Sequence, residues 1–557
     1  MEILKNHEYE IEITGITSEG NGVGRIGDYA VFIPDTAVGE RCLIKLVQKR
    51  SSYGFGKLLR VLTPSSDRIA SDCAAFPQCG GCMYRHITYA AECVVKEQAV
   101  RDVFSRIGHI DAPVLPIIGS ARQTAYRNKA QYPFGVDKAG NLTCGFYARR
   151  SHRIVPCESC ALHPTLFEQI RRAVCRLVQE RRIPVYDEQS HKGILRHLYL
   201  RMGEKTEEMM VCFVVAKRQP ERFISLAKAL AGQFPQIKSV VLNVNPEKTN
   251  VILGTECIPI YGSGTITDDL CGVKISLSPL SFYQVNHDQA EILYETALDW
   301  ASLTPDDTLL DLYCGAGAIG LSAAHRVKRL IGVEIVPEAV ENAKRNAAEN
   351  GIKNAEFFCA DAGAAAVHFA KEGIRPDVIV VDPPRKGLDE NVIRAIRKMA
   401  PERLIMVSCN PATAARDTAL LKEQGYAVEK IIPVDMFPRT AHVETVVLLS
   451  HKNPDGHINV KVEFGEGEGK VPLDNIAKRA EAYKPKERVT YKMVKEYIEA
   501  KYGFKVHTAY ITEVKRDLGL PMYDAPNAVE ELKQPRKHPT PEKVEAIKDA
   551  LKHFEVI

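Results

Sequence analysis

The sequence predicts a multidomain protein in which an OB-like β-barrel is followed by an α+β central domain, a Rossmann-like α/β domain and a helical C-terminal extension. Three observations lead to this fold class. The 557 residues suffice for three or four domains of about 150 residues each. The chain begins with short alternating strands, whereas strand–helix units repeat between about residues 275 and 450. The composition, 45% hydrophobic and 26% charged, excludes a disordered chain, a collagen-like repeat and a small disulfide scaffold.

Charge and hydropathy bear on whether this protein binds nucleic acid, enters a membrane or is secreted. The net charge of +4 is too small to argue for nucleic-acid binding by itself, so that case must come from local motifs. No window approaches the roughly 20 apolar residues of a membrane-spanning helix, and the first residues lack the apolar core of a signal peptide. We therefore expect a cytoplasmic protein without membrane contact. Its 15 cysteines are then expected to be reduced, and to serve as metal ligands, catalytic groups or buried filler.

Residues 1–63 form the predicted barrel. Tyr9, Ile11 and Ile13 alternate with polar residues, which is the period of a half-buried strand. Basic side chains and aromatic rings then lie close together along the chain, as Lys45, Lys49, Arg50, Tyr53, Phe55, Lys57 and Arg60. This combination suits single-stranded nucleic acid, whose bases stack on rings while its phosphates are neutralised. A solvated barrel surface explains the same residues, and both interpretations remain open.

Two groups of cysteines follow the barrel. Cys73, Cys79 and Cys82 lie within ten residues among glycine and proline, and Cys157 and Cys160 form a second pair far downstream. Such clusters are hard to explain as core filler. Four thiolates could hold zinc or an iron–sulfur cluster, and spacing alone does not separate the two.

The central domain, residues 64–270, alternates strands and helices. A helix is predicted over 88–107, with Thr88 as N-cap and Gly108 as the stop, and it could pack on the domain that follows. Two basic runs, 126–129 and 148–153, could touch phosphate, but we interpret both as solvated strand ends.

Residues 271–452 carry the pattern of a parallel sheet with helical crossovers. Asp311 is followed by Gly315 and Gly317 where a strand gives way to a helix, and glycines there let the backbone approach a ligand. Glu334 ends the next strand, where a carboxylate can accept both hydroxyls of a ribose. An adenosine ligand is favoured, and NAD and S-adenosylmethionine both fit at this point.

Later loops of the same domain carry reactive side chains. Asp382 and Cys409 each follow a predicted strand, so they are expected at the carboxyl edge of the sheet, and Glu444 brackets a further strand. A cysteine, carboxylates and an adenosine pocket on one edge indicate covalent catalysis with proton transfer. Hydride transfer needs no such cysteine.

With these motifs in place, residues 1–450 resemble the RNA uracil-5-methyltransferase family, in its iron–sulfur-containing 23S ribosomal RNA branch. The motifs that carry the resemblance are Ser281-Phe-Tyr-Gln-Val-Asn, Asp311-Leu-Tyr-Cys-Gly-Ala-Gly, Asp382-Pro-Pro-Arg-Lys-Gly, Ser408-Cys-Asn-Pro-Ala-Thr and His442-Val-Glu-Thr-Val. By this resemblance the barrel looks like an RNA-binding TRAM domain, and the α/β domain looks like a class I methyltransferase.

The resemblance implies a function and a set of site residues. The implied reaction is S-adenosylmethionine-dependent methylation of carbon 5 of a uridine in 23S ribosomal RNA, through a covalent adduct between cysteine and uracil. Cys409 would be the nucleophile and Glu444 the base. The residues that would contact S-adenosylmethionine are Gln284, Tyr313, Glu334 and Asp382, and those that would hold a [4Fe–4S] cluster are Cys73, Cys79, Cys82 and Cys160. Cys157 is an added neighbour of the cluster ligands. The partner would be RNA; no protein partner is implied, and a monomer is expected.

Several alternatives remain at this point. Methylation of a transfer RNA uridine uses the same chemistry. RNA cytosine-5 methyltransferases usually place a second cysteine after the proline of the Asp-x-Pro loop, where this chain has Arg385. Radical methylthiotransferases also combine a TRAM module with clustered cysteines, but they use Cys-x3-Cys-x2-Cys, and the first spacing here is five. A non-catalytic RNA-binding iron–sulfur protein would have no use for Cys409 and Glu444.

The extension, residues 453–557, lies outside the resemblance. Three helices are predicted there, over 490–501, 507–518 and 541–553. Periodicity cannot separate a helix–turn–helix nucleic-acid reader from a helical packing module; we favour the packing module, and no role follows from the pattern.

Overall fold

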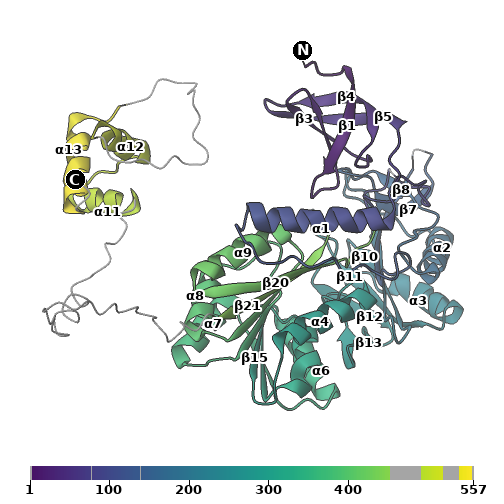
Figure 1. The fold of residues 1–557 in the computed structure, drawn as a ribbon. Coiled ribbons are helices and arrows are strands. Elements are labelled where there is room, and N and C mark those ends of the chain that lie inside the picture. The colour runs from purple at the N-terminus through teal and green to yellow at the C-terminus, as the bar shows by residue number, and fades with distance from the viewer. Residues whose placement is uncertain (1–2, 77, 138, 452–490, 519–537, 555–557) are drawn as a thin grey trace, which may run out of the picture. The chain divides into compact units, whose positions relative to one another are not determined.

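The computed structural model describes residues 3–76, 78–137, 139–451, 491–518 and 538–554. The chain separates into two compact units, Met1–His457 and Ile458–Ile557, and each is described by itself. Figure 1 shows the barrel, the central domain and the α/β domain of the first unit. Within the described ranges, no helix is long and apolar enough to cross a membrane.

A closed five-stranded barrel begins the first unit. Its strands are β1 (Glu8–Ile16), β2 (Gly22–Ile26), β3 (Tyr29–Ile33), β4 (Arg41–Lys49) and β5 (Tyr53–Thr63), in the order β1-β2-β3-β5-β4. The predicted alternation places Ile11 and Ile13 in the barrel core with Val31 and Ile44. The structure therefore confirms the predicted barrel.

The central domain is built on a seven-stranded sheet in the order β12-β11-β10-β9-β6-β7-β8. Its strands are β6 (Lys129–Val136), β7 (Leu142–Tyr147), β8 (Ile154–Pro156), β9 (Leu195–Met202), β10 (Met209–Val215), β11 (Ile237–Val244) and β12 (Glu256–Tyr261). Every residue of β9 and β10 is buried. Alternate side chains explain this: Leu198 and Phe213 pack in a core with helices α2 (Thr165–Glu180) and α3 (Glu221–Gln233), whereas Tyr199 and Met210 join the core of the α/β domain. The two domains thus share one apolar core.

Helix α1 (Tyr89–Arg106) links the cysteine-rich segment to the α/β domain. The Thr88 hydroxyl accepts a hydrogen bond from the Ala91 amide at 3.3 Å and caps the helix, as predicted. Val100 and Phe104 are fully buried in the core of the α/β domain. Figure 1 shows α1 lying along α9 and β20, elements more than 300 residues further along the chain.

The α/β domain contains a second seven-stranded sheet in the order β17-β16-β15-β18-β19-β21-β20. Its strands are β15 (Thr308–Leu312), β16 (Arg329–Glu334), β17 (Ala355–Cys359), β18 (Val378–Val381), β19 (Arg403–Ser408), β20 (Tyr426–Val434) and β21 (Glu444–His451). β15 to β19 pair in parallel, and β21 runs antiparallel between β19 and β20. A short hairpin, β13 (Ile266–Leu270) and β14 (Val273–Leu277), precedes the sheet.

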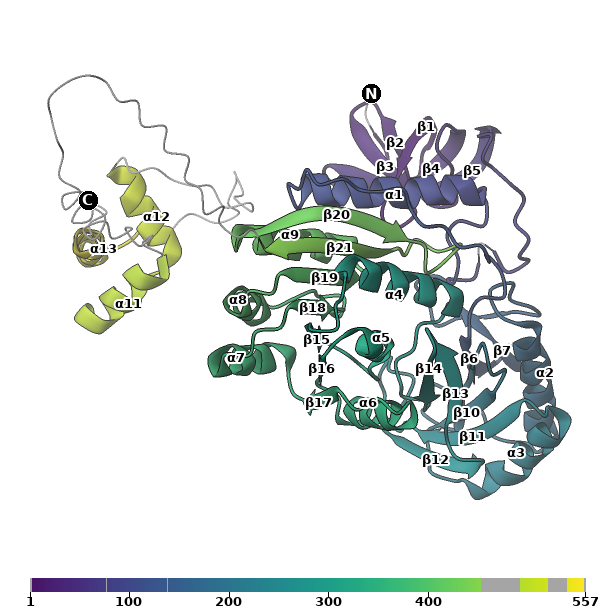
Figure 2. The same ribbon diagram turned by 60° about the horizontal axis from the view of Figure 1, so that its bottom comes forward.

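Helices cover both faces of this sheet, as Figure 2 shows. They are α4 (His287–Ala301), α5 (Ala318–Ala323) and α6 (Pro337–Glu349) on one face, and α7 (Ala362–Glu372), α8 (Glu390–Met399) and α9 (Pro411–Glu423) on the other. With both faces covered, strand β18 consists of four buried apolar residues. The predicted Rossmann-like α/β architecture is confirmed.

The second unit contains α11 (Tyr491–Tyr502), α12 (Thr508–Asp517) and α13 (Pro541–His553). Each helix lies within one residue of its predicted bounds. Ile498, Ile511 and Ile547 meet in a small core, and the Lys501 ammonium pairs with the Asp549 carboxylate at 2.8 Å. Residues 453–490, 519–537 and 555–557 of the predicted extension lie outside the described residues.

Candidate active site

The sheet topology brings the predicted site residues to one edge of the α/β domain. Tyr313, Asp382 and Cys409 directly follow the parallel strands β15, β18 and β19, and Glu334 ends β16. Glu444 begins β21, and because β21 is antiparallel to β19, its first residues lie at the same edge: Thr445 pairs with Ser408. A pocket of about 590 Å³ opens there. Its lining includes the six residues proposed from the sequence, which are Gln284, Tyr313, Glu334, Asp382, Cys409 and Glu444.

One side of the pocket is a turn held by Glu334. Its two carboxylate oxygens accept hydrogen bonds from the Gly315 amide at 3.1 Å and the Val336 amide at 2.9 Å. Tyr313 adopts φ +69°, a left-handed conformation that a tyrosine rarely takes. The backbone therefore fixes the carboxylate in place, and its remaining lone pairs are free to accept hydroxyl donors from a ligand in the pocket.

Asp311 supports this turn from beneath. The side chain is buried, and it accepts a hydrogen bond from the Gly320 amide at 3.0 Å. Burial raises the pKa of Asp311 to about 8. Glycine at 320 is needed for this approach, since a Cβ there would lie 2.9 Å from the Asp311 carboxylate.

The opposite side of the pocket holds the reactive groups. Burial, and then the nearby Asp382 carboxylate, raise the pKa of Glu444 to about 8. Burial alone raises the pKa of Asp382 to about 7. Burial also raises the pKa of the Cys409 thiol, and the carboxylates of Glu444 and Asp382 add to this effect while Arg385 opposes it. A thiol and a carboxyl group whose pKa lies near neutrality can supply a nucleophile and a proton acceptor in one site.

The central domain contributes a residue that the sequence did not identify as a pocket residue. Lys129 starts β6 and lines the pocket, where burial, followed by the charges of Arg201 and Arg127, lowers its pKa to about 8. The interpretation of residues 126–129 as a solvated strand end is therefore wrong: Tyr126 is fully buried and Asn128 donates to the Gln284 carbonyl at 2.9 Å. No local signal could reveal this, because the pocket forms only when the two domains pack together.

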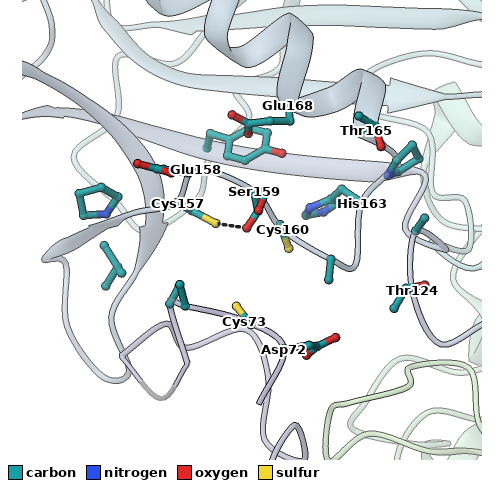
Figure 3. A pocket seen from close by; sticks show the side chains of 18 of the residues that line it. Asp72, Cys73, Thr124, Cys157, Glu158, Ser159, Cys160, His163, Thr165 and Glu168 are labelled. Atoms are coloured by element: carbon teal, nitrogen blue, oxygen red, sulfur yellow. Dashed lines mark hydrogen bonds between the residues drawn. The ribbon is translucent and has the colours of Figure 1, made fainter. Parts of the chain in front are cut away.

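Five cysteines of the central domain line one small cavity of about 60 Å³: Cys73, Cys79, Cys82, Cys157 and Cys160. Figure 3 shows Cys73 facing Cys157 and Cys160 across the larger pocket that adjoins this cavity. The Cys79 sulfur accepts from the Gly81 amide at 3.4 Å and the Cys82 sulfur from the Arg85 guanidinium at 3.3 Å. Such donors favour thiolates, but burial is the larger effect and raises the pKa of both the Cys79 and the Cys82 thiol. The described residues nevertheless include no group of three or more Cys, His, Asp or Glu side chains arranged to hold a metal ion.

The barrel presents three aromatic rings to its surroundings. Phe32, Tyr53 and Phe55 lie with ring centroids 5.7 to 5.8 Å apart, on the paired strands β3 and β5. Phe55 and the neighbouring Lys57 also line a groove of about 1030 Å³ between the barrel and the central domain.

Comparison with known proteins identifies relatives of this arrangement. Residues 165–452 match the family profile described as tRNA (uracil-5-)-methyltransferase, and residues 4–59 match the TRAM domain. An uncharacterized RNA methyltransferase of Halalkalibacterium halodurans is 43% identical over 452 residues, which are 81% of this chain and 98% of that protein. One from Staphylococcus aureus is 39% identical, over 81% of this chain and 99% of that protein. About a fifth of the chain lies outside each match.

A solved structure shares the same architecture. The tRNA (uracil-54, C5)-methyltransferase of Pyrococcus abyssi, in complex with S-adenosyl-L-homocysteine, superposes with a TM-score of 0.62 at 26% identity. The match covers 79% of this chain and 99% of that chain.

Proposed function

We propose that this chain, which belongs to the tRNA (uracil-5-)-methyltransferase family, methylates carbon 5 of a uridine in 23S ribosomal RNA through a covalent adduct between Cys409 and the uracil ring. The proposal rests mainly on one observation: Cys409 and Glu444 line the same pocket as Glu334, a carboxylate placed to bind the ribose of an adenosine ligand. A non-catalytic RNA-binding protein would have no use for this combination.

Glu334 would hold the ribose of S-adenosylmethionine, because its backbone-anchored carboxylate can accept two vicinal hydroxyls. Gln284, Tyr313 and Asp382 line the same pocket and would complete the cofactor site. When bound, S-adenosylmethionine supplies an electrophilic sulfonium methyl group. The P. abyssi enzyme, crystallised with S-adenosyl-L-homocysteine, supports this choice over NAD.

The two reactive residues would divide the chemistry between them. Carbon 5 of uracil is a poor nucleophile, and attack of the Cys409 thiolate on carbon 6 turns the ring into an enolate in which carbon 5 is electron-rich. After carbon 5 is methylated, Glu444 removes the proton that remains there, and expulsion of Cys409 restores the ring. The uridine must leave its stack to expose carbon 6, so it is flipped out or lies in an unpaired loop.

The cysteine cavity is proposed to hold a [4Fe–4S] cluster through Cys73, Cys79, Cys82 and Cys160. The chemistry of the donors fits: all four thiols border one cavity, and Arg85 places positive charge beside Cys82. Cys157 is the weaker candidate for the fourth ligand because its thiol is turned to the Ser159 carbonyl, at 2.9 Å. The cluster would connect distant segments and takes no part in the methyl transfer.

The choice of 23S ribosomal RNA rests on the resemblance of residues 1–450 to the iron–sulfur-containing 23S ribosomal RNA branch of the family, which the TRAM barrel and the clustered cysteines help to carry. Transfer RNA is the second candidate, because the P. abyssi enzyme that shares this fold acts on uridine 54 of a tRNA. Cytosine-5 methylation is disfavoured by Arg385, which lines the pocket where those enzymes place a second cysteine. Incubating the purified protein with S-adenosylmethionine and either RNA, followed by nucleoside mass spectrometry, tests the assignment. We expect 5-methyluridine in 23S ribosomal RNA; its appearance only in transfer RNA, or of 5-methylcytidine in either RNA, would overturn it.

A further inference from the structure

The loop that connects β20 to β21, residues 435–443, ends directly at Glu444, and its Phe437 and His442 line the pocket. Five consecutive carbonyl oxygens of this loop, from Asp435 to Arg439, each accept a hydrogen bond from outside it. The donors, in order, are Gln289 (3.0 Å), Asn286 (3.1 Å), Lys96 (3.1 Å), the Tyr126 hydroxyl (2.8 Å) and the amides of Met83 (2.8 Å) and Tyr84 (3.2 Å). In an ordinary surface loop, most of these carbonyl oxygens would accept hydrogen bonds from water instead.

The hydrogen bonds to these five carbonyl oxygens together form a clamp on the loop. Lys96 of α1 is the charged residue at the centre of this clamp. The side chain is buried, and its ammonium bonds the Glu92 and Asp435 carboxylates, each at 2.7 Å, in addition to the Phe437 carbonyl. Glu92 in turn accepts from the Arg439 amide at 2.6 Å. A buried ion pair of this kind is weak evidence for stability but fixes geometry, because each charge has one arrangement that satisfies it.

The clamp holds the loop in a strained conformation. Arg439 has φ +70°, in the left-handed region that favours glycine, and both its amide and its carbonyl are bonded to the segment 83–92. Strain of this kind persists only where the surroundings impose it. Residues 83–96, which include the start of α1, therefore help to determine the path by which the chain enters Glu444.

We propose that Lys96 and Tyr126 are positioning residues that act through residues 435–443 to set Glu444 for proton removal. The proposal rests on the proposed function, since it needs Glu444 as the base. It assigns these residues to one step: the elimination that releases Cys409, and not the binding of S-adenosylmethionine, whose Glu334 is held by Gly315 and Val336.

Two variants test the proposal, each with a matched control. Lys96→Met removes the buried ammonium that pairs with Glu92 four residues earlier. Its control is Arg101→Met, which breaks an ion pair with the same spacing on the same helix, between Arg101 and the more exposed Glu97. Tyr126→Phe deletes one hydroxyl that donates to the Pro438 carbonyl. Tyr426→Phe deletes another buried hydroxyl that donates to a proline carbonyl, that of Pro401, away from the loop. Tyr126→Phe buries no unpaired charge, so it keeps the test valid if Lys96→Met does not fold.

The measurement is the decay rate of the denaturation-resistant protein–RNA adduct in a single turnover, together with the Kd for S-adenosylmethionine. We expect slowing by at least about tenfold for Lys96→Met and about fivefold for Tyr126→Phe, the size of one hydrogen bond. The Kd should stay within about twofold, and both controls should match wild type. A folded Tyr126→Phe or Lys96→Met variant that eliminates at the wild-type rate, or loses cofactor affinity in proportion to activity, would overturn the positioning role. Wild-type protein that forms no adduct with RNA containing 5-fluorouridine would instead overturn the proposed function, and this inference with it.

Discussion

At the scale of single residues, the pocket contains two carboxyl groups, those of Glu444 and Asp382, whose pKa burial raises well above the usual value. Glu444 is 2% exposed, and its pKa of about 8 means that it is mostly protonated at neutral pH. The nearby Asp382 carboxylate raises that pKa further, whereas burial alone raises the pKa of Asp382 to about 7. A base of this strength accepts a proton from carbon 5 more readily than an exposed glutamate would.

The elimination step should therefore depend on pH. Glu444 must be ionised to accept a proton, and its pKa is raised, so the active form is lost as the pH falls through about 8. Adduct decay in wild type should accelerate between about pH 7 and 9 and level off above that range, when followed by quenched single-turnover assays. Glu444→Gln should show a slow decay without this pH dependence. A wild-type rate that is flat from about pH 6 to 9 would exclude Glu444 as the base.

At the scale of helices and strands, much of the site follows from sheet topology. Residues after successive parallel strands meet at the carboxyl edge, so the positions of Glu334, Asp382 and Cys409 could be predicted from their strands alone. The antiparallel course of β21 could not be predicted, and the role of Glu444 as the base follows only from the family resemblance. Lys129 reaches the pocket from the central domain, and Lys96 reaches the loop 435–443 from α1. Neither contact could be predicted, because the sequence around each lysine carries no signal of it.

The cysteine-bearing segments make a second prediction at this scale. Protein purified without oxygen should be brown, with an absorption shoulder near about 400 nm, as expected of thiolate-bound iron–sulfur centres. Cys79→Ser should lose this absorption, whereas Cys212→Ser, at a fully buried cysteine of β10 away from the cavity, should keep it. Metal analysis that finds zinc without iron in the anaerobic protein would contradict the cluster.

At the scale of the whole molecule, the central domain and the α/β domain of the first unit build one site together. The central sheet shares its core with the α/β domain and supplies Lys129, and α1 joins the cysteine-rich segment to the loop before Glu444. The barrel adds a separate surface of aromatic rings and exposed cations, which suits a flexible RNA strand. Methylation of a large RNA would use both surfaces, one for affinity and one for chemistry.

The barrel should account for part of the salt dependence of RNA binding. Replacing the exposed Lys57 and Arg60 by glutamine should weaken binding and reduce the slope of log K against log salt by about one for each phosphate that is no longer neutralised. Arg222→Gln with Lys228→Gln removes the same two charges from an exposed part of α3, and should leave the slope unchanged. Equal slopes for all three proteins would show that these barrel residues do not bind RNA.

The central claim is that Cys409 forms a covalent bond to uracil and Glu444 resolves it. Denaturing gel electrophoresis of protein incubated with S-adenosylmethionine and 23S ribosomal RNA fragments tests both halves at once. Glu444→Gln should accumulate a protein–RNA adduct, because attack and methylation proceed while proton removal stalls, and Cys409→Ala should form no adduct and no 5-methyluridine. Cys314→Ala, which removes a buried thiol at the same sheet edge, serves as the cysteine control. A Cys409→Ala variant that still produces 5-methyluridine would contradict the account.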